Sequence, residues 1–242
     1  MQGAVYCPDI MTTISANLQA VKSRIRAAAQ SAGRDAGAAR LLAVAKSWPA
    51  ARVRLAFAAG QRAFGENYVQ EGVAKITALD DLDLEWHFIG PLQSNKTRDL
   101  AEHFDWVHSL DRLKIAERLS AQRPVGASPL QVCLQVNVSG EASKGGVTPG
   151  ETAALARAVA KLPRLRLRGL MAIPEPNTEV EQLRPRFAEL RQLLARLNAE
   201  GMQLDTLSMG MSDDFEIAIA EGATIVRLGT AIFGLREKKG IP

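Results

Sequence analysis

The stretch RLLAVAKS, residues 40–47, is the first of eight short apolar runs that decide the fold. Its apolar residues follow one another without alternation, which is typical of a strand buried on both faces of a parallel sheet. The other runs are RAFGENY (62–68), LEWHFIG (84–90), DWVHSL (105–110), LQVCLQVNVS (130–139), LRLRGLMAI (165–173), DTLSMG (205–210) and TIVRLG (224–229). Lys46 raises a question of its own, because its ammonium group stands where the first strand should end.

Segments with helical spacing separate the eight runs. They cover residues 51–60, 69–79, 95–104, 112–122, 150–162, 179–201 and 213–222. Strands that alternate with helices indicate βαβ units and a parallel sheet. Eight such units in about 200 residues predict an α/β fold, a closed (β/α)8 TIM barrel. An open doubly wound sheet is the alternative, and the even spacing of the units favours closure.

An extra helix is predicted ahead of the barrel, over residues 11–33, with Gly33 in the position of a C-cap. The residues that recur there at helical spacing are Ile14, Leu18, Val21, Ile25 and Ala28. No linker or low-complexity segment divides the chain. We therefore expect a tail over residues 1–10 and one barrel domain over residues 11–242.

Composition narrows the classes of protein to consider. Of 242 residues, 47% are hydrophobic and 23% are charged, as in an ordinary globular protein. No run approaches the ~20 apolar residues of a membrane span, and the N-terminal MQGAVYCPDIMTT lacks the basic start of a signal peptide. Cys7 and Cys133 are too few for a disulfide framework. These features predict a cytoplasmic protein with no membrane association.

The charge balance invites a nucleic-acid hypothesis. Thirty Lys and Arg stand against 26 Asp and Glu, and the isoelectric point is near 9.3. However, the charges are dispersed, and 5% aromatic residues leave little for base stacking. We expect no nucleic-acid partner. We also expect no metal site, because His87, His103 and His108 do not have the spacing of metal ligands.

The ends of the last two predicted strands have the character of a phosphate site. TIM barrels often bind phosphate with the loops that follow strands 7 and 8 and a short helix. Here those loops are SMGMS (208–212) and RLGTAIFG (227–234), and Gly229-Thr230 could open a helix with its N–H groups toward an anion. The alternative is that Ser212 and Asp213 only cap a helix, in a capping box with Glu216. The two loops together favour the phosphate site.

Lys46 admits two interpretations. Its amine could simply emerge from the barrel mouth, or it could be partly desolvated and attack an aldehyde to form a Schiff base. A reactive lysine opposite a phosphate site favours pyridoxal 5′-phosphate (PLP), with Arg227 as the partner of the pyridine nitrogen. A phosphosugar aldolase or isomerase is the competing hypothesis on these residues alone.

Longer motifs carry a specific resemblance. They are AVAKSWPA, FGENYVQEG, WHFIGPLQSNK, HSLDR, GLMAIPEP and LSMGMSDDFEIAIAEGATIVRLGTAIFG. With them the chain resembles the YggS/PROSC family of PLP homeostasis proteins, from about residue 14 to residue 236. The resemblance implies the barrel of the alanine racemase N-terminal domain, PLP as the cofactor and a role in vitamin B6 balance.

The same resemblance implies the roles of particular residues. Lys46 matches the lysine that forms the internal aldimine, Arg227 the arginine facing the pyridine nitrogen, and Asn67 a residue beside the cofactor. The residues that match positions around the phosphate are Ser208, Ser212, Gly229 and Thr230. Lys144 matches a family lysine of less certain role. Trp48 departs from the pattern, because many relatives have a small or polar residue there.

Enzyme and carrier remain to be distinguished. Alanine racemases of similar fold use a tyrosine from a second domain, and this chain ends after the barrel with only Tyr6 and Tyr68. An arginine at the pyridine nitrogen also weakens the ring as an electron sink. We therefore expect a monomeric PLP-binding protein with no catalytic residues, which stores PLP or delivers it to apo-enzymes. The alternative is a single-domain PLP-dependent amino-acid racemase.

Overall fold

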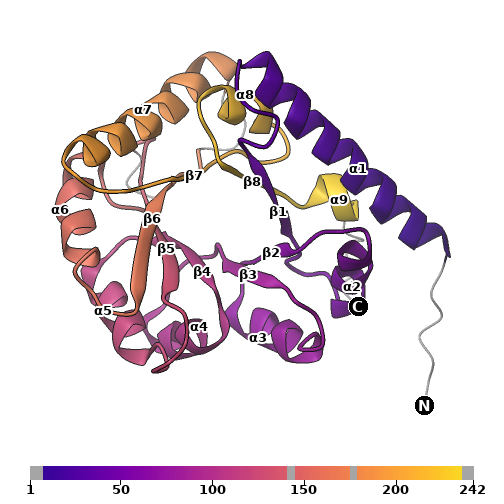
Figure 1. Ribbon diagram of the computed structural model, residues 1–242, viewed down its shortest axis with the longest axis horizontal. Coiled ribbons are helices and arrows are strands. Elements are labelled where there is room, and N and C mark those ends of the chain that lie inside the picture. The colour runs from indigo at the N-terminus through magenta and orange to yellow at the C-terminus, as the bar shows by residue number, and fades with distance from the viewer. Residues whose placement is uncertain (1–7, 141–144, 175–178, 236–242) are drawn as a thin grey trace, which may run out of the picture.

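The computed structural model describes residues 8–140, 145–174 and 179–235, without the side chains of residues 8–10. Over these residues, eight parallel strands close into a barrel with helices around it (Figure 1). The strands follow one another in chain order, and β1 pairs with β8 to close the ring. The predicted (β/α)8 barrel is therefore confirmed, and the open sheet is wrong.

Each of the eight apolar runs contains one strand. The strands are β1 (Arg40–Val44), β2 (Ala63–Glu66), β3 (Glu85–Phe88), β4 (Trp106–Leu110), β5 (Leu130–Gln135), β6 (Leu165–Met171), β7 (Thr206–Ser208) and β8 (Ile225–Leu228). The helices are α1 (Pro8–Ser31), α2 (Ala50–Ala58), α3 (Val69–Ala78), α4 (Thr97–His103), α5 (Leu113–Gln122), α6 (Pro149–Val159), α7 (Val180–Ala199), α8 (Phe215–Ala220) and α9 (Thr230–Phe233), with a 3-10 turn η1 (Ser94–Lys96) before α4.

The barrel wall separates two apolar regions, because side chains alternate between its two faces. On β1, Leu41 and Ala43 belong to the large core between strands and helices, whereas Leu42 and Val44 belong to a small separate cluster. A third small apolar cluster consists of Trp106, Cys133 and Met171. Buried polar groups occupy another part of the barrel interior, and they are His87, His108, Ser208 and Arg227.

The N-terminal helix completes the outer ring. α1 lies on the outside between α8 and α2, with α9 beside it (Figure 1). Asn17 Nδ2 donates to the Ile232 carbonyl of α9 at 3.0 Å, and Arg24 pairs with Glu216 of α8 at 2.5 Å. α1 begins at Pro8, inside the predicted tail, while residues 1–7 lie outside the described part of the chain.

A glycine permits the close approach of β6 and β7. A Cβ at Gly169 would lie 1.9 Å from the Thr206 carbonyl oxygen, well inside van der Waals contact. Because the obstacle is backbone, no side-chain rotation could relieve it. Gly169 therefore sets the spacing of the two strands at the point where β7 turns toward the barrel interior.

We predict that Gly169→Ala destabilises the protein by about 3 kcal/mol, the upper range for overpacking. Gly150 in the first turn of α6 is the control, because a Cβ there would meet nothing within 4 Å. Gly150→Ala should change the free energy of unfolding by less than about 0.5 kcal/mol. Urea denaturation of both variants measures the difference, and equal stabilities would contradict the assigned spacing.

Candidate functional site

A cavity of about 460 Å³ opens at the C-terminal ends of the strands. This is the end at which TIM barrels carry their functional residues, and the volume suits a small-molecule ligand. Six of the seven residues predicted from the sequence line it: Lys46, Asn67, Ser212, Arg227, Gly229 and Thr230. The seventh, Ser208, does not. The sequence prediction thus brings together residues from the ends of β1, β2, β7 and β8.

The loop after β7 folds back on itself. Asp214 accepts a hydrogen bond from the Met211 backbone N–H at 2.5 Å. Gly210 has φ of +94°, and a Cβ there would lie 2.7 Å from the Ala218 Cβ, so both conformation and space require glycine. This fold places Ser212 and Asp213 on the cavity wall.

The capping-box alternative for this loop is wrong. Asp214, not Asp213, precedes the first residue of α8, and no side chain caps that helix. Glu216 pairs instead with Arg24 of α1. Ser212 is consequently available to a ligand in the cavity.

The turn from β8 into α9 passes directly over the end of β1. A Cβ at Gly229 would lie 3.0 Å from the Val44 carbonyl oxygen. α9 begins at Thr230, as the sequence indicated. The backbone of this turn therefore approaches Lys46 closely, since Lys46 follows Val44 by two residues.

Two residues of α3 hold the peptide groups on either side of Lys46. Lys75 Nζ donates to the Ala45 carbonyl at 2.7 Å, and the Ser47 backbone N–H donates to Glu71 Oε1 at 2.5 Å. Ser47 has φ of +65°, a conformation that costs a non-glycine residue energy and needs support from its surroundings. We call Lys75 and Glu71 the α3 clamp. It fixes the backbone from which the Lys46 side chain extends.

The α3 clamp contacts a buried carboxylate, that of Glu66 in β2. Lys75 Nζ lies 2.6 Å from Glu66 Oε1 and 2.7 Å from Glu71 Oε1. Burial raises the pKa of Glu66 from 4.5 to about 7, although the Lys75 ammonium opposes the shift. The sequence interpretation missed this pair. The available signal was Glu66 at the end of an apolar strand, followed nine residues later by Lys75 on the apolar side of a helix.

Trp48 forms a wall of the cavity, which explains its place after the Lys46 loop. Its ring centroid lies 6.0 Å from that of Phe233 in α9 and 5.1 Å from the Arg52 guanidinium carbon. The indole therefore links the loop after β1 to the helix after β8. These two segments carry Lys46 and Thr230.

Arg227 reaches the cavity from a buried position. Its Nη1 donates to the Ser208 carbonyl at 2.6 Å and to Ser208 Oγ at 2.8 Å, and its Nη2 donates to the Ala172 carbonyl at 2.9 Å. Burial lowers the pKa of Arg227 to about 10, so it remains a cation at neutral pH. Ser208 lies inside the barrel as a support of Arg227, which explains its absence from the cavity wall.

Other expectations concern residues away from the cavity. Lys144 lies outside the described residues. Within the described part of the chain, no group of three or more His, Cys, Asp and Glu side chains could hold a metal ion. No helix there is long and apolar enough to cross a membrane.

Comparisons with known proteins give the class first. Residues 16–237 match the model of the alanine racemase N-terminal domain. Alanine racemase from Corynebacterium glutamicum superposes with a TM-score of 0.69 at 19% identity, covering 96% of this chain and 64% of the racemase chain. At that identity the likeness concerns the fold. The chain has the barrel of the alanine racemase N-terminal class.

Closer relatives give the family. The pyridoxal phosphate homeostasis protein of Pseudomonas aeruginosa is 64% identical over 227 residues, or 94% of this chain and 97% of the relative. That of Escherichia coli K12 is 54% identical over 233 residues, covering 94% and 98%. The chain belongs to the pyridoxal phosphate homeostasis protein family, as the sequence motifs indicated. These relatives carry a homeostasis name and not the name of an enzyme.

One similar protein of known structure has been solved with PLP bound. PipY of Synechococcus elongatus with PLP bound superposes with a TM-score of 0.80 at 41% identity, covering 91% of this chain and all of PipY. The structure of PipY without PLP gives a TM-score of 0.82 at 42% identity, with the same coverage. Both share the barrel described above.

We predict that Lys75→Met destabilises the protein by about 3 kcal/mol near pH 8, because it leaves the Glu66 charge buried and unpaired. The loss should shrink below about pH 6, where Glu66 takes up a proton and no charge remains buried. Denaturation at the two pH values measures the effect. Lys161→Met, at an exposed position just after α6, is the control, and a loss that does not depend on pH would contradict the pairing.

Proposed function

We propose that this protein holds PLP in the cavity, attached to Lys46, and takes part in vitamin B6 homeostasis by storing or delivering it. One observation carries the proposal. A lysine at the end of β1, held by the α3 clamp, shares a single cavity with the loops after β7 and β8. PLP needs both an amine for its aldehyde and a seat for its phosphate.

The cavity residues fit this cofactor. When bound, PLP supplies an aldehyde carbon that a deprotonated lysine amine attacks with loss of water. Ser212 and Thr230 offer hydroxyl groups to the phosphate, beside the closely packed backbone of Gly229. Arg227, which lines the same cavity, would face the pyridine nitrogen. These assignments rest on shared lining of the cavity and on the family to which the chain belongs.

Asn67 gives an independent indication of a ligand. Its Oδ1 is buried and has no hydrogen-bond partner among the described residues, and Asn67 lines the cavity. A buried acceptor without a partner costs about 1–3 kcal/mol. A ligand that donates a hydrogen bond at this point, or a bridging water, would recover that energy.

The geometry favours a carrier over a racemase. Racemisation needs a second acid–base group on the face opposite the lysine. Tyr68 is 60% exposed, and neither Tyr68 nor the buried His87 and His108 line the cavity. Arg227 stays charged at neutral pH and donates hydrogen bonds, so it leaves a pyridine nitrogen unprotonated. Without a protonated nitrogen the ring stabilises a carbanion poorly.

Partners and compartment follow from this function. We infer that apo-enzymes dependent on PLP receive the cofactor, that the protein acts as a monomer, and that it works in the cytoplasm. Burial raises the pKa of the Cys133 thiol to about 12, which keeps it protonated and inert and suits a reducing compartment. The single barrel domain over residues 11–242 remains a prediction.

We predict that the purified protein with PLP shows the visible absorption of lysine-bound PLP, and that Lys46→Ala abolishes it. Lys161→Ala, at an exposed position just after α6, should retain the band. Absorption spectra after reduction with borohydride test whether the link is covalent. A band that persists in Lys46→Ala would show that another lysine carries the cofactor.

We further predict no racemase-like turnover. Incubation of the PLP-loaded protein with L-alanine in deuterated water should give α-deuterium incorporation far below ordinary enzymatic rates of about 1–1,000 per second. Mass spectrometry of the amino acid measures it. Exchange within that range, lost in Lys46→Ala, would favour the racemase alternative.

A further inference from the structure

A row of hydrogen-bonded side chains leads from Arg227 into the barrel. Arg227 Nη1 donates to Ser208 Oγ at 2.8 Å, and Ser208 Oγ lies 2.7 Å from His108 Nδ1. His108 Nε2 in turn lies 2.8 Å from His87 Nδ1. All four residues are buried, and they come from β8, β7, β4 and β3.

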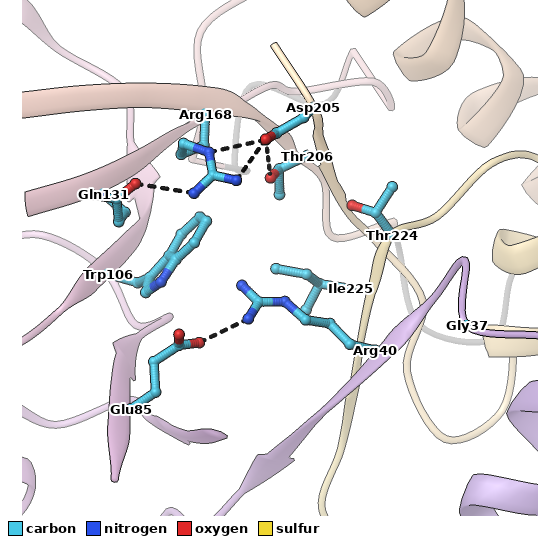
Figure 2. A pocket seen from close by; sticks show the side chains of 10 residues that line it. All are labelled: Gly37, Arg40, Glu85, Trp106, Gln131, Arg168, Asp205, Thr206, Thr224 and Ile225. Atoms are coloured by element: carbon cyan, nitrogen blue, oxygen red, sulfur yellow. Dashed lines mark hydrogen bonds and ion pairs between the residues drawn. The ribbon is translucent and has the colours of Figure 1, made fainter. Parts of the chain in front are cut away.

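The row ends at the mouth formed by the N-terminal ends of the strands, which we call the lower mouth. His87 Nε2 lies 2.5 Å from Glu85 Oε1, and the same oxygen accepts from Arg40 Nη1 at 2.9 Å. Glu85 and Arg40 are the first residues of β3 and β1, whereas the cavity that holds Arg227 is at the other ends of the strands. Figure 2 shows Arg40 and Glu85 joined beside Trp106 at this lower mouth.

The charges of Arg227 and Glu85, at the two ends of the row, determine which atom donates and which accepts in each of its hydrogen bonds. Burial alone would raise the pKa of Glu85. The donors His87 and Arg40 outweigh burial and lower that pKa, so Glu85 is ionised at neutral pH. Burial lowers the pKa values of His87 and His108, so both rings are neutral at neutral pH. Each neutral imidazole has one N–H donor and one acceptor nitrogen.

Glu85 therefore decides both tautomers. A carboxylate only accepts, so His87 must carry its proton on Nε2 and accept with Nδ1. His108 must then donate from Nε2 and accept with Nδ1. The Ser208 hydroxyl consequently donates to His108 while its oxygen accepts from Arg227. Every donor points away from the cavity, from the cation at Arg227 to the anion at Glu85.

This direction matters at the cavity because it commits the Ser208 proton. Because the Ser208 hydroxyl donates its hydrogen bond to His108, the lone pairs of Ser208 Oγ face Arg227. They accept from Nη1 and hold it in place. The Arg227 Nε and one N–H of Nη2 have no partner among the described residues. Those donors are the ones that remain for a ligand in the cavity.

We propose that Ser208, His108, His87 and Glu85 act as positioning residues for Arg227, and that the carboxylate at the lower mouth sets the orientation of the arginine that meets the cofactor. We call these four residues the barrel relay. The proposal rests on the proposed function, since it assigns the relay an effect on PLP. It places a determinant of cofactor binding on the far side of the barrel from the cofactor.

The lower mouth provides a matched control. A second carboxylate, Asp205, pairs there with Arg168 at 2.5 Å, and Arg168 and Arg40 each lie about 5 Å from the Trp106 ring centroid. Figure 2 shows the two acid–arginine pairs on the wall of one cavity. Asp205 bonds to Arg168 and Thr206 and makes no contact with either histidine. Only Glu85 belongs to the barrel relay.

The first test needs no cofactor. Long-range 1H–15N NMR of the 15N-histidine-labelled protein at neutral pH reports the tautomer of each ring. We expect neutral Nε2–H tautomers for both His87 and His108, with exposed His103 of α4 as the internal reference. An Nδ1–H tautomer or a charged ring at either position would overturn the relay.

The second test links the relay to the cofactor. Glu85→Gln should give mixed tautomers, shift the absorption band of bound PLP and weaken PLP binding about fivefold to tenfold, the net effect of one ordinary hydrogen bond. Asp205→Asn should leave all three unchanged within about twofold. Equal effects of the two variants, or altered tautomers with unchanged PLP affinity and spectrum, would overturn the proposal.

The two proposals fail differently. If the wild-type protein shows no lysine-bound PLP, the proposed function fails, whereas the tautomer measurement still decides whether the relay exists. Circular dichroism and thermal melts of Glu85→Gln establish that it folds. If it does not fold, His108→Gln is the second variant, because it interrupts the row at a position distant from the lower mouth, and the same shift in band and affinity is expected.

Discussion

The structure depends on the burial of one guanidinium group. A cation inside a protein needs hydrogen-bond acceptors, because its desolvation costs several kcal/mol. Arg227 obtains acceptors from two neighbouring strands, through the Ser208 carbonyl of β7 and the Ala172 carbonyl after β6. Gly169 keeps those two strands at the required spacing. The apolar filling of an ordinary barrel would leave no place for this cation.

A second cationic residue, Lys46, lines the same cavity, and its support is of a different kind. Lys46 is held through its backbone by Lys75 and Glu71, so its side chain remains able to react. Arg227, in contrast, is held through its side chain and oriented. The cavity thus combines an amine whose backbone is held with a guanidinium whose side chain is held. Both attract an anionic ligand, and only the first can form a bond with it.

The sequence predicted the barrel and the cavity wall because both follow from local signals. Eight apolar runs predict eight strands, and parallel strands bring their C-terminal ends to one mouth, so Lys46 and Thr230 were expected to meet. The position of Ser208 could not be predicted in this way. One residue decides whether a side chain at a strand end points into the cavity or beneath it, and strand boundaries from sequence are less exact than that.

Side-chain contacts between elements were also beyond the sequence. His87 and His108 lie inside the barrel and bond to each other. Their pairing depends on the register of β3 with β4, which no local pattern specifies. The Glu66–Lys75 pair likewise joins a strand to a helix. Trp48 departed from the family pattern, and its role became clear only from its contact with Phe233.

The closure of β1 against β8 has a consequence for the newly made chain. Arg227, Gly229 and Thr230 are near the end of the sequence, whereas Lys46 and the α1 residues that pack on α9 are near its beginning. A chain still emerging from the ribosome has Lys46 before it has Arg227 or the turn into α9. Synthesis must therefore pass Thr230 before the cavity exists, and a ligand bound there marks a barrel that has closed.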